Sequence, residues 1–361
     1  SYADGEGIAV PSVIKSGRGL VSQAADLMRE VGLMGRAFVV TDRNVYAHSG
    51  QTLSENLARG GFEPVVNMLN PGEQTKTLRS LEVLYDWLAV ARAERSVVIV
   101  ALGGGVVGDL AGFLAARYVR GMPLVQIPTT LLAQVDSSIG GKTGVNHPKA
   151  KNLIGAFYQA NLVVVDTSLL ATLPAREFRG GLGEVVKYGV ILDAELFDLI
   201  EVKQAELLKQ DSAVVDHVVA RCADLKVQVV GEDEREAGLR MILNFGHTIG
   251  HAIEAATNYE ALLHGEAVGI GMSGAAQIAV ELGMFDAAGC QRLQALLKVL
   301  GLPYAARGLA WELVRDAMSL DKKTRSGRIN WILPTAIGSV EIRDDVPDQV
   351  VEQVLRTLLN A

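Results

Sequence analysis

Apolar and polar positions follow two different periods along the chain. In the first half, short apolar runs rich in β-branched residues alternate with segments of helical spacing. Strands that alternate with helices of about 10–15 residues are typical of a parallel sheet with right-handed crossovers. The pattern predicts an edge strand over residues 8–16, a buried strand over residues 36–42, further strands over residues 63–69, 97–100, 124–127 and 161–166, and helices over residues 19–31, 50–60 and 77–92.

The pattern changes after Leu173-Pro174. From there to about Gly301, apolar residues recur mainly at helical spacing, as over residues 194–208, 213–230, 249–256 and 265–282. Strand signals return at residues 329–333 and 339–342, before an amphipathic helix over residues 347–359. We therefore predict an α/β protein with an N-terminal Rossmann-like parallel-sheet domain over residues 1–174 and a mainly α-helical C-terminal domain over residues 175–361.

Composition narrows the classes of function. The chain has 361 residues, of which 49% are hydrophobic, and this suits a globular protein of two domains. A net charge of −7 argues against a nucleic-acid surface, which needs a basic face. We expect no signal peptide, and no uncharged apolar run approaches the roughly 18–20 residues that span a bilayer. Cys222 and Cys290 are expected to be buried thiols, so we predict a cytoplasmic protein.

A glycine-rich junction follows the strand predicted at residues 97–100. Gly103, Gly105 and Gly108 fit the pattern G-x-G-x-x-G, in which bare backbone approaches a pyrophosphate at a helix N-terminus. The next strand ends in Pro-Thr-Thr, ahead of a polar, glycine-rich loop segment over residues 136–144. Two such junctions at the carboxyl edge of one sheet favour a dinucleotide site.

The acidic residue of this predicted site has an unusual place. Asp42 ends the strand at residues 36–42, upstream of the glycines, where a carboxylate is suited to accept hydrogen bonds from ribose hydroxyls. The standard fingerprint has its acidic residue about 20 residues downstream instead. The departure favours a variant of the Rossmann fold.

Three histidines gather in the helical half. His247 and His251 are four residues apart and share one helix face, and His264 follows. Neutral imidazole is a preferred zinc ligand, and catalytic zinc sites commonly use three protein ligands. The spacing indicates a metal site but leaves open whether all three histidines bind, or two of them with a carboxylate.

Charged residues also interrupt apolar sequence in this half. Glu184 and Lys187 lie three residues apart among glycines and apolar residues, at what we expect to be the start of a helix. Lys226 and Arg240 have similarly apolar neighbours in the sequence. A solvated surface pair is the ordinary interpretation of Glu184 and Lys187. Basic residues placed in this way in an acidic protein favour a pocket for an anionic ligand.

Longer motifs extend over both halves of the chain. They are TDRNV at residues 41–45, PGEQTK at 71–76, GGGVVGDLAGF at 103–113, IPTTLLAQVDSSIGGKTGVN at 127–146, KNLIGAFYQ at 151–159, GGLGEVVKYG at 180–189, NFGHTIGHAIE at 244–254 and LHGEAVGIGM at 263–272. In sequence and in order they resemble the 3-dehydroquinate synthase family of sugar-phosphate cyclases.

The resemblance implies a Rossmann-like domain and a helical domain, bound NAD⁺, one Zn²⁺ or Co²⁺, and a homodimer. The implied reaction converts 3-deoxy-D-arabino-heptulosonate 7-phosphate to 3-dehydroquinate and phosphate by transient oxidation, phosphate elimination, re-reduction and aldol closure. By motif, the metal ligands would be Glu184, His247 and His264. His251 would then serve the substrate or a proton transfer.

The same resemblance implies roles for other residues. The NAD⁺ contacts would be Asp42, Asn44, Glu73, Lys76, Gly104, Gly105, Val106, Asp109, Thr129, Thr130, Leu132, Ser137, Lys142, Lys151 and Thr172. The catalytic residues would be Asp136, Lys142, Asn152, Lys187, Lys226 and His251. The other substrate contacts would be Arg120, Arg240, Asn244 and Lys322, with Lys323 as the alternative to Lys322.

The chain departs from the family pattern at Gly183, where alanine is usual, at Leu169, where an aromatic residue is common, and at Arg176, near a frequent glutamine. Three rival functions remain to be weighed. They are a related cyclase acting on a heptulose 7-phosphate or glucose 6-phosphate, a metal-dependent polyol dehydrogenase, and a nucleotide sensor without catalysis. The match at Lys226, Arg240, Asn244 and His251 disfavours the first.

Overall fold

The computed structural model describes residues 12–236, 238–259, 261–324 and 328–359, with the backbone alone for residues 320–324. The chain divides into two compact units, Ser1–Leu173 and Pro174–Ala361, which we call the N-terminal and the C-terminal unit. This division lies one residue from the boundary that the hydrophobic pattern predicts.

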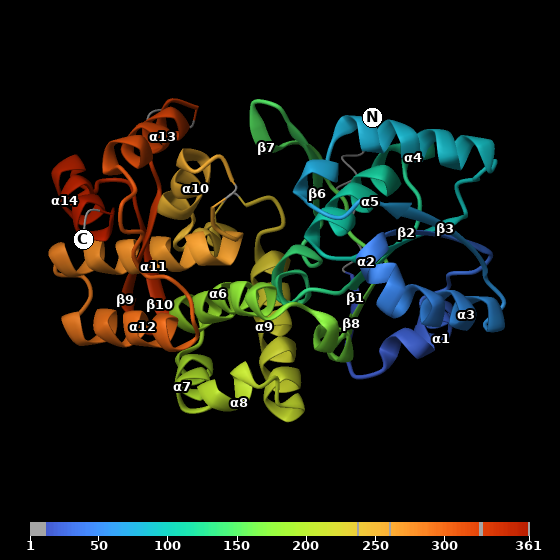
Figure 1. The fold of residues 1–361 in the computed structure, drawn as a ribbon, viewed down its shortest axis with the longest axis horizontal. Coiled ribbons are helices and arrows are strands. Elements are labelled where there is room, and N and C mark those ends of the chain that lie inside the picture. The colour runs from blue at the N-terminus through green and yellow to red at the C-terminus, as the bar shows by residue number, and fades with distance from the viewer. Residues whose placement is uncertain (1–11, 237, 260, 325–327, 360–361) are drawn as a thin grey trace, which may run out of the picture. The chain divides into compact units, whose positions relative to one another are not determined.

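A six-stranded sheet forms the centre of the N-terminal unit (Figure 1). Its order is β1-β8-β5-β4-β2-β3, and every neighbouring pair is parallel, which confirms the predicted sheet. The strands are β1 (Val13–Gly17), β2 (Arg36–Asp42), β3 (Glu63–Leu69), β4 (Val98–Gly103), β5 (Leu124–Pro128) and β8 (Leu162–Asp166). β1 is an edge strand, as expected, but it is centred a few residues later than predicted.

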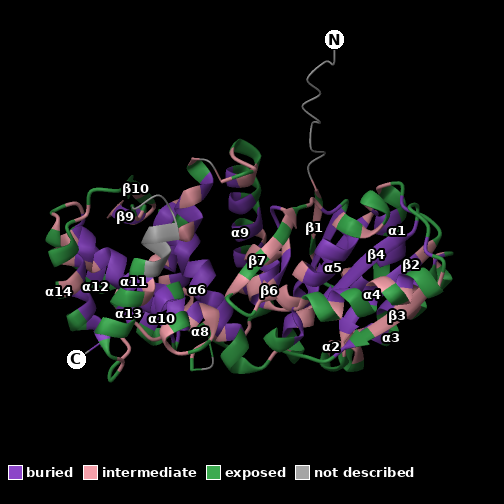
Figure 2. Cartoon of the chain, turned by 90° about the horizontal axis from the view of Figure 1, so that it is seen from above, coloured by how far each residue is buried: buried purple, intermediate pink, exposed green. Residues whose placement is uncertain are grey.

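Helices cover both faces of the sheet. On one face, α1 (Ala24–Glu30) and α3 (Gln51–Arg59) pack on side chains such as Val39 and Val100. On the other, α4 (Leu78–Val90) and α5 (Gly105–Arg117) cover residues that point the opposite way, and Phe38 meets Trp87 at 4.9 Å between ring centroids. β4 and β8 are buried along their whole length, which explains their near-continuous apolar runs in the sequence. Figure 2 shows β4 in the buried interior of this unit.

Short helical turns make most of the remaining connections in this unit. They are η1 (Leu20–Gln23), α2 (Arg43–Val45), η2 (Tyr46–Gly50), η3 (Glu73–Thr75), η4 (Tyr118–Arg120), η5 (Ala133–Ser137) and η6 (Thr167–Thr172).

An antiparallel hairpin, β6 (Lys142–His147) and β7 (Ala150–Phe157), replaces part of what the sequence suggested was loop. Glycine made this segment look irregular, but the pairing itself requires glycine. A Cβ on Gly144 would lie 2.6 Å from the carbonyl oxygen of Ile154, and one on Gly155 would overlap the carbonyl oxygen of Thr143. The prediction of a loop was therefore wrong for residues 142–144 because local composition conceals a close backbone approach.

The C-terminal unit is mainly helical, as predicted, and α11 lies at its centre. α11 (His264–Glu281) packs against α6, α10, α12, α14 and β9. The other elements are α6 (Ala175–Ile191), α7 (Ala194–Val202), α8 (Gln204–Leu208), α9 (Ser212–Glu232), η7 (Leu239–Asn244), α10 (His247–Ala256), α12 (Ala287–Val299), α13 (Trp311–Thr324), β9 (Trp331–Ala336), β10 (Ser339–Arg343) and α14 (Asp348–Leu359).

Helix α6 corrects one expectation. Glu184 and Lys187 do not begin a helix; they lie in the middle of α6, which starts at Ala175. The glycines that suggested a break allow close packing instead. A Cβ on Gly183 would lie 2.6 Å from the carbonyl oxygen of Gly265, and one on Gly265 would overlap the carbonyl oxygen of Gly180. Glycine at 183, where the family usually has alanine, thus stands at the contact between α6 and α11.

Both cysteines are buried and form no disulfide, as predicted. Burial raises the pKa of the Cys222 thiol, and it raises the pKa of Cys290 to about 11, so both stay protonated near neutral pH. None of the helices in the described part of the chain combines the length and the apolar character that a membrane crossing requires.

Candidate functional site

Several predicted residues lie at the carboxyl edge of the parallel sheet. β2 ends at Asp42, β4 at Gly103 and β5 at Pro128, and these three strands are neighbours in the order β5-β4-β2. Ligands of open α/β sheets bind beyond this edge. The sheet therefore brings together positions that are 25 to 86 residues apart in sequence.

The N-terminus of α5 offers backbone N–H groups at this edge. Gly104 is the N-cap residue of this 13-residue helix, and no side chain caps it. A Cβ on Gly104 would lie 2.9 Å from Cγ2 of Thr130, and one on Gly105 would lie 3.1 Å from Oγ of Ser137. That hydroxyl is buried and makes no hydrogen bond among the described residues. A bare helix N-terminus beside an unsatisfied hydroxyl fits a phosphate group.

A second group of predicted residues forms a polar cluster around Lys76, whose side chain is buried. The Lys76 ammonium donates to Oδ2 of Asp109 and, at 2.6 Å, to Oδ1 of Asn152. Asn152 adopts a positive φ of 54°. Its backbone N–H donates to Oδ1 of Asn146, and Nδ2 of Asn146 donates to Oε1 of Glu73 at 2.7 Å. The structure thus joins residues that the motifs had assigned separately to cofactor and substrate.

The remaining predicted residues of this unit lie on several other segments. Asp42 uses its carboxylate to cap α2, accepting from the N–H groups of Asn44 and Val45 at 2.8 and 3.0 Å. The exposed side chains of Asn44, Arg120 and Thr172 lie on separate segments of this unit. Val106 and Leu132 are half-buried on α5 and before η5, Thr129 is buried after β5, Asp136 lies on η5, and Lys142 and Lys151 lie on β6 and β7.

In the C-terminal unit, three elements place acidic and imidazole side chains around one point. Oε1 of Glu184, on α6, lies 3.4 Å from Nε2 of His247, on α10, and 3.4 Å from Nε2 of His264, on α11. Ligand atoms of His247, His251 and His264 all lie within 4.8 Å of one another. Oε2 of Glu184 forms an ion pair with Lys187, and both residues are fully buried.

Each of two histidines has its second nitrogen engaged. Nδ1 of His247 lies 3.1 Å from the carbonyl oxygen of Phe245, and Nδ1 of His264 lies 3.2 Å from Oε2 of Glu254. In both rings Nε2 is therefore the nitrogen that faces Glu184. One carboxylate and two or three imidazoles whose ligand atoms converge fit a divalent cation such as Zn²⁺.

The electrostatics of this cluster favour positive charge. Burial alone would raise the pKa of the Glu184 carboxyl, but Lys187 and His247 hold that pKa well below its usual range. Burial opposes protonation of His264, but hydrogen bonds with Glu184 and Glu254 outweigh it and raise the pKa of the ring to about 10. The carboxylates of Glu184 and Glu254 thus favour positive charge on the His264 ring that lies between them.

A cavity of about 430 Å³ opens beside the histidines. Its lining includes Asn244, His247 and His251, together with Glu236, which sequence reasoning did not select. Asn244 forms a hydrogen bond with Glu236, which adopts a positive φ of 60°. Glu236 was missed because it belongs to the charged run GEDERE, which is typical of a solvated surface.

The predicted cations of this unit are deeply buried. Lys226 is 5% exposed on α9, and Arg240 is 1% exposed on η7, where its backbone N–H donates to Asp233. Arg176 makes a bidentate ion pair with Glu266 at 2.8 and 2.7 Å, so its departure from the family pattern serves packing within this unit. The side chains of Lys322 and Lys323 lie outside the described residues.

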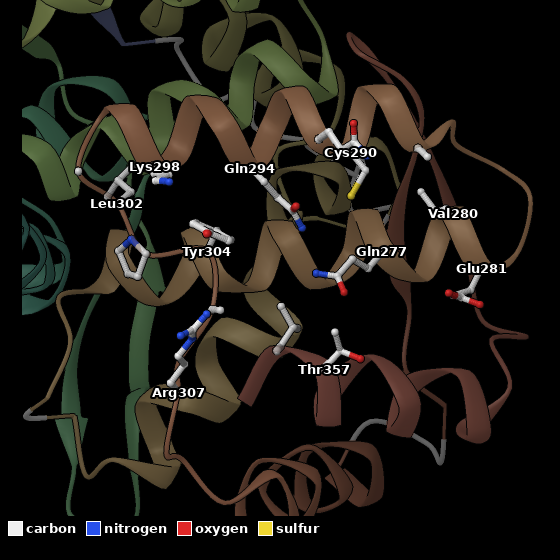
Figure 3. Close-up of a pocket in the computed structure, with 16 residues that line it drawn as sticks. Gln277, Val280, Glu281, Cys290, Gln294, Lys298, Leu302, Tyr304, Arg307 and Thr357 are labelled. Carbon is white, nitrogen blue, oxygen red and sulfur yellow. The ribbon is translucent and has the colours of Figure 1, made fainter. Parts of the chain in front are cut away.

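A larger cavity, of about 860 Å³, lies between α11, α12, α14 and the segment after α12 (Figure 3). Lys298, Tyr304 and Arg307 lie at one end of it, and Val280 and Glu281 at the other. Its lining contains none of the residues predicted for the site.

Comparison with known proteins identifies the family. The model of the 3-dehydroquinate synthase N-terminal domain matches residues 66–180, and that of the C-terminal domain matches residues 181–324. A 3-dehydroquinate synthase from Nostoc punctiforme is 48% identical over 339 residues, which are 93% of each chain.

Solved structures of related cyclases have the same fold. The 2-epi-5-epi-valiolone synthase ValA from Streptomyces hygroscopicus subsp. jinggangensis, with NAD⁺ and Zn²⁺ bound, is 32% identical, with a TM-score of 0.90 over 97% of each chain. A 2-deoxy-scyllo-inosose synthase with carbaglucose-6-phosphate, NAD⁺ and Co²⁺ is 26% identical, with a TM-score of 0.87 over 96% of each chain. With matches of this length in both units, the chain belongs to the 3-dehydroquinate synthase family.

Proposed function

We propose that this protein is an NAD⁺- and metal-dependent 3-dehydroquinate synthase, which converts 3-deoxy-D-arabino-heptulosonate 7-phosphate to 3-dehydroquinate and phosphate. The observation that carries the proposal is the convergence of Glu184, His247 and His264 from three helices on one point. The 48% identity to a 3-dehydroquinate synthase over most of the chain supports the substrate.

Glu184, His247 and His264 would hold one Zn²⁺ or Co²⁺, with His251 beside them. When bound, the ion would act as a Lewis acid that favours the alkoxide of a substrate hydroxyl. Lys187, whose ammonium pairs with Glu184, would keep that carboxylate ionised and add positive charge where negative charge develops. His251 is suited to move protons, because its imidazole lines the cavity without being needed as a third ligand.

The N-terminal unit would hold NAD⁺ against the carboxyl edge of its sheet. The backbone at Gly104 and Gly105 and the hydroxyls of Thr130 and Ser137 would bind the pyrophosphate, and Asp42 would meet a ribose. When bound, NAD⁺ would accept a hydride from the substrate and return it within one turnover. The same proposal includes the other predicted NAD⁺ contacts, which are Asn44, Glu73, Lys76, Val106, Asp109, Thr129, Leu132, Lys142, Lys151 and Thr172.

Cations would bind the two anionic ends of the substrate, its carboxylate and its phosphate. Lys226 and Arg240 are buried in the C-terminal unit, and burial away from water strengthens their attraction for an anion. Arginine adds bidentate pairing, for which its planar fork is preorganised. The other proposed substrate and catalytic contacts are Arg120, Asp136, Lys142, Asn152, Asn244 and Lys322. The homodimer and the cytoplasmic location stay predictions.

The test is phosphate release from the heptulosonate phosphate by the purified protein. We expect release that requires NAD⁺, stops after chelation of the metal, and returns when Zn²⁺ is added. NADH should not accumulate, because the hydride is returned in each cycle. Stoichiometric NADH would instead identify a polyol dehydrogenase.

A matched substrate separates this proposal from the related cyclases. Sedoheptulose 7-phosphate lacks the carboxylate. If Arg240 and its neighbours bind that group, the protein should not turn over sedoheptulose 7-phosphate. Faster turnover of sedoheptulose 7-phosphate or glucose 6-phosphate than of the heptulosonate phosphate would overturn the proposed substrate.

A further inference from the structure

Glu254 is a buried carboxylate for which the sequence predicted no role. It lies on α10, is 5% exposed, and contacts Nδ1 of His264 through Oε2 at 3.2 Å. The opposite nitrogen of the same ring, Nε2, faces Oε1 of Glu184 at 3.4 Å. The imidazole of His264 is thus held between two carboxylates, one on each nitrogen.

With a cation bound at Nε2, the remaining ring proton of His264 lies on Nδ1, where Glu254 can accept it. A carboxylate accepts a hydrogen bond only from a protonated Nδ1, which leaves Nε2 with its lone pair free in the neutral ring. A carboxylate that accepts from a ligating histidine orients the ring and raises its basicity as a metal ligand. Glu254 therefore turns the nitrogen that can bind a metal toward Glu184 and His247.

The two histidine ligands differ in how they are oriented. For His247 the acceptor is the backbone carbonyl of Phe245, at 3.1 Å, which no substitution removes. For His264 the acceptor is a side chain that also carries negative charge. The His264 side chain is 29% exposed and that of His247 11%, so His264 depends more on a dedicated partner for its orientation.

The backbone that follows Glu254 is also constrained. Asn258 and Tyr259 adopt positive φ values of 52° and 61°, which are uncommon for residues with side chains. The N–H of Tyr259 donates to the carbonyl oxygen of Glu254 at 2.7 Å. These turns end α10 close to Glu254, in the same short connection that leads to His264.

We propose that Glu254 is a positioning residue that presents His264 Nε2 to the divalent cation. The proposal rests on the metal site of the proposed function. Glu254 would act on the metal through His264, so its removal should weaken metal binding without removing a ligand.

The experiment measures Zn²⁺ affinity by competition with a chromophoric chelator. Relative to the wild type, Glu254→Ala should lower the affinity roughly 10- to 100-fold, the usual effect of losing such a partner. Glu254→Gln should have a smaller effect, because the amide oxygen still accepts from Nδ1 while the charge is lost. Asp193→Asn is the matched control: Asp193 is also a buried carboxylate of this unit, but it pairs with Arg221 and caps α7. This control should keep wild-type Zn²⁺ affinity.

A double-mutant cycle separates positioning from a general structural role. In the His264→Ala background, Glu254→Ala should cost no further Zn²⁺ affinity, because the ring through which it acts is gone. An equal loss in both backgrounds would overturn the proposal, as would wild-type affinity in Glu254→Ala. If Glu254→Ala does not fold, as judged by circular dichroism of the metal-free protein, Glu254→Gln in the same cycle decides.

The wild type distinguishes this proposal from the one on which it rests. If wild-type protein binds no Zn²⁺, both proposals fail. If it binds one Zn²⁺ and the Glu254 variants bind it equally well, only the role of Glu254 fails.

Discussion

The two units prepare for ligands of opposite charge by opposite means. The N-terminal unit uses backbone: glycines at 104 and 105 leave the N-terminus of α5 bare, and a helix N-terminus favours an anion. The C-terminal unit uses side chains: Glu184 and two or three imidazoles converge in a way that favours a cation. The first site requires positions without a side chain, whereas the second requires particular side chains.

This difference decides how each site tolerates change. A side-chain site fails when one functional group is removed, because the remaining buried charges lose their partner. A backbone site keeps its N–H groups under any substitution except proline, and otherwise fails when an added side chain fills the space. Metal affinity and NAD⁺ affinity should therefore respond to separate sets of substitutions.

Glu184→Gln should have the largest effect. It leaves the ammonium of Lys187, which is 1% exposed, beside a neutral amide, and removing one partner of a buried ion pair typically costs about 3–5 kcal/mol. We expect the free energy of unfolding of the metal-free protein to fall by about that amount, and bound Zn²⁺ to be lost. Denaturant unfolding and elemental analysis measure the two effects.

Binding of NAD⁺ by the Glu184→Gln protein is the control for this comparison, and it should stay near the wild-type level. One stoichiometric Zn²⁺ in this variant would contradict the assignment of Glu184 as a ligand.

Gly265→Ala should have an intermediate effect, because the added Cβ overlaps the backbone of Gly180 and forces α6 and α11 apart. Overpacking of this kind typically costs about 1–3 kcal/mol, and the shift also displaces His264 relative to Glu184. Gly231→Ala is the matched control, since a Cβ there has no neighbour within 4 Å and lies on a helix, where alanine is favoured by up to about 1 kcal/mol. Thermal unfolding and Zn²⁺ titration of both variants test this, and equal stability of the two would refute the close packing.

Gly104→Ala should have the smallest effect, confined to the other unit. Its Cβ would lie 2.9 Å from a methyl group of Thr130, a side chain that can shift, and would narrow the space for the pyrophosphate. We expect the Kd for NAD⁺ to rise roughly tenfold, which is about 1.4 kcal/mol, with Zn²⁺ affinity unchanged. Fluorescence titration with NAD⁺ measures the change; weakened Zn²⁺ binding in this variant would break the contrast between the two sites.

Much of the fold was predictable because its signals are local. The strands at residues 36–42 and 63–69 lie where the sequence indicated, and β2, which is buried along nearly its whole length, has the continuous apolar run that burial on both faces requires. The hairpin of β6 and β7 was missed, and so was the true start of α6. In both cases glycine suggested irregular backbone, but the reason for it is contact with backbone distant in sequence.

The sequence by itself determined which chemical groups are available. It supplied a strand, glycines and a helix in one continuous segment, and it placed His247 and His251 on one helix face. It left open whether a third histidine or a carboxylate completes the set, and the family resemblance alone suggested Glu184. Only the tertiary structure placed the Nε2 atoms of His247 and His264 each at 3.4 Å from Oε1 of Glu184, and Glu254 behind His264. The physical reason is that a helix fixes the spacing of its own side chains, whereas the distance between helices depends on packing, which here relies on glycines at 180, 183 and 265.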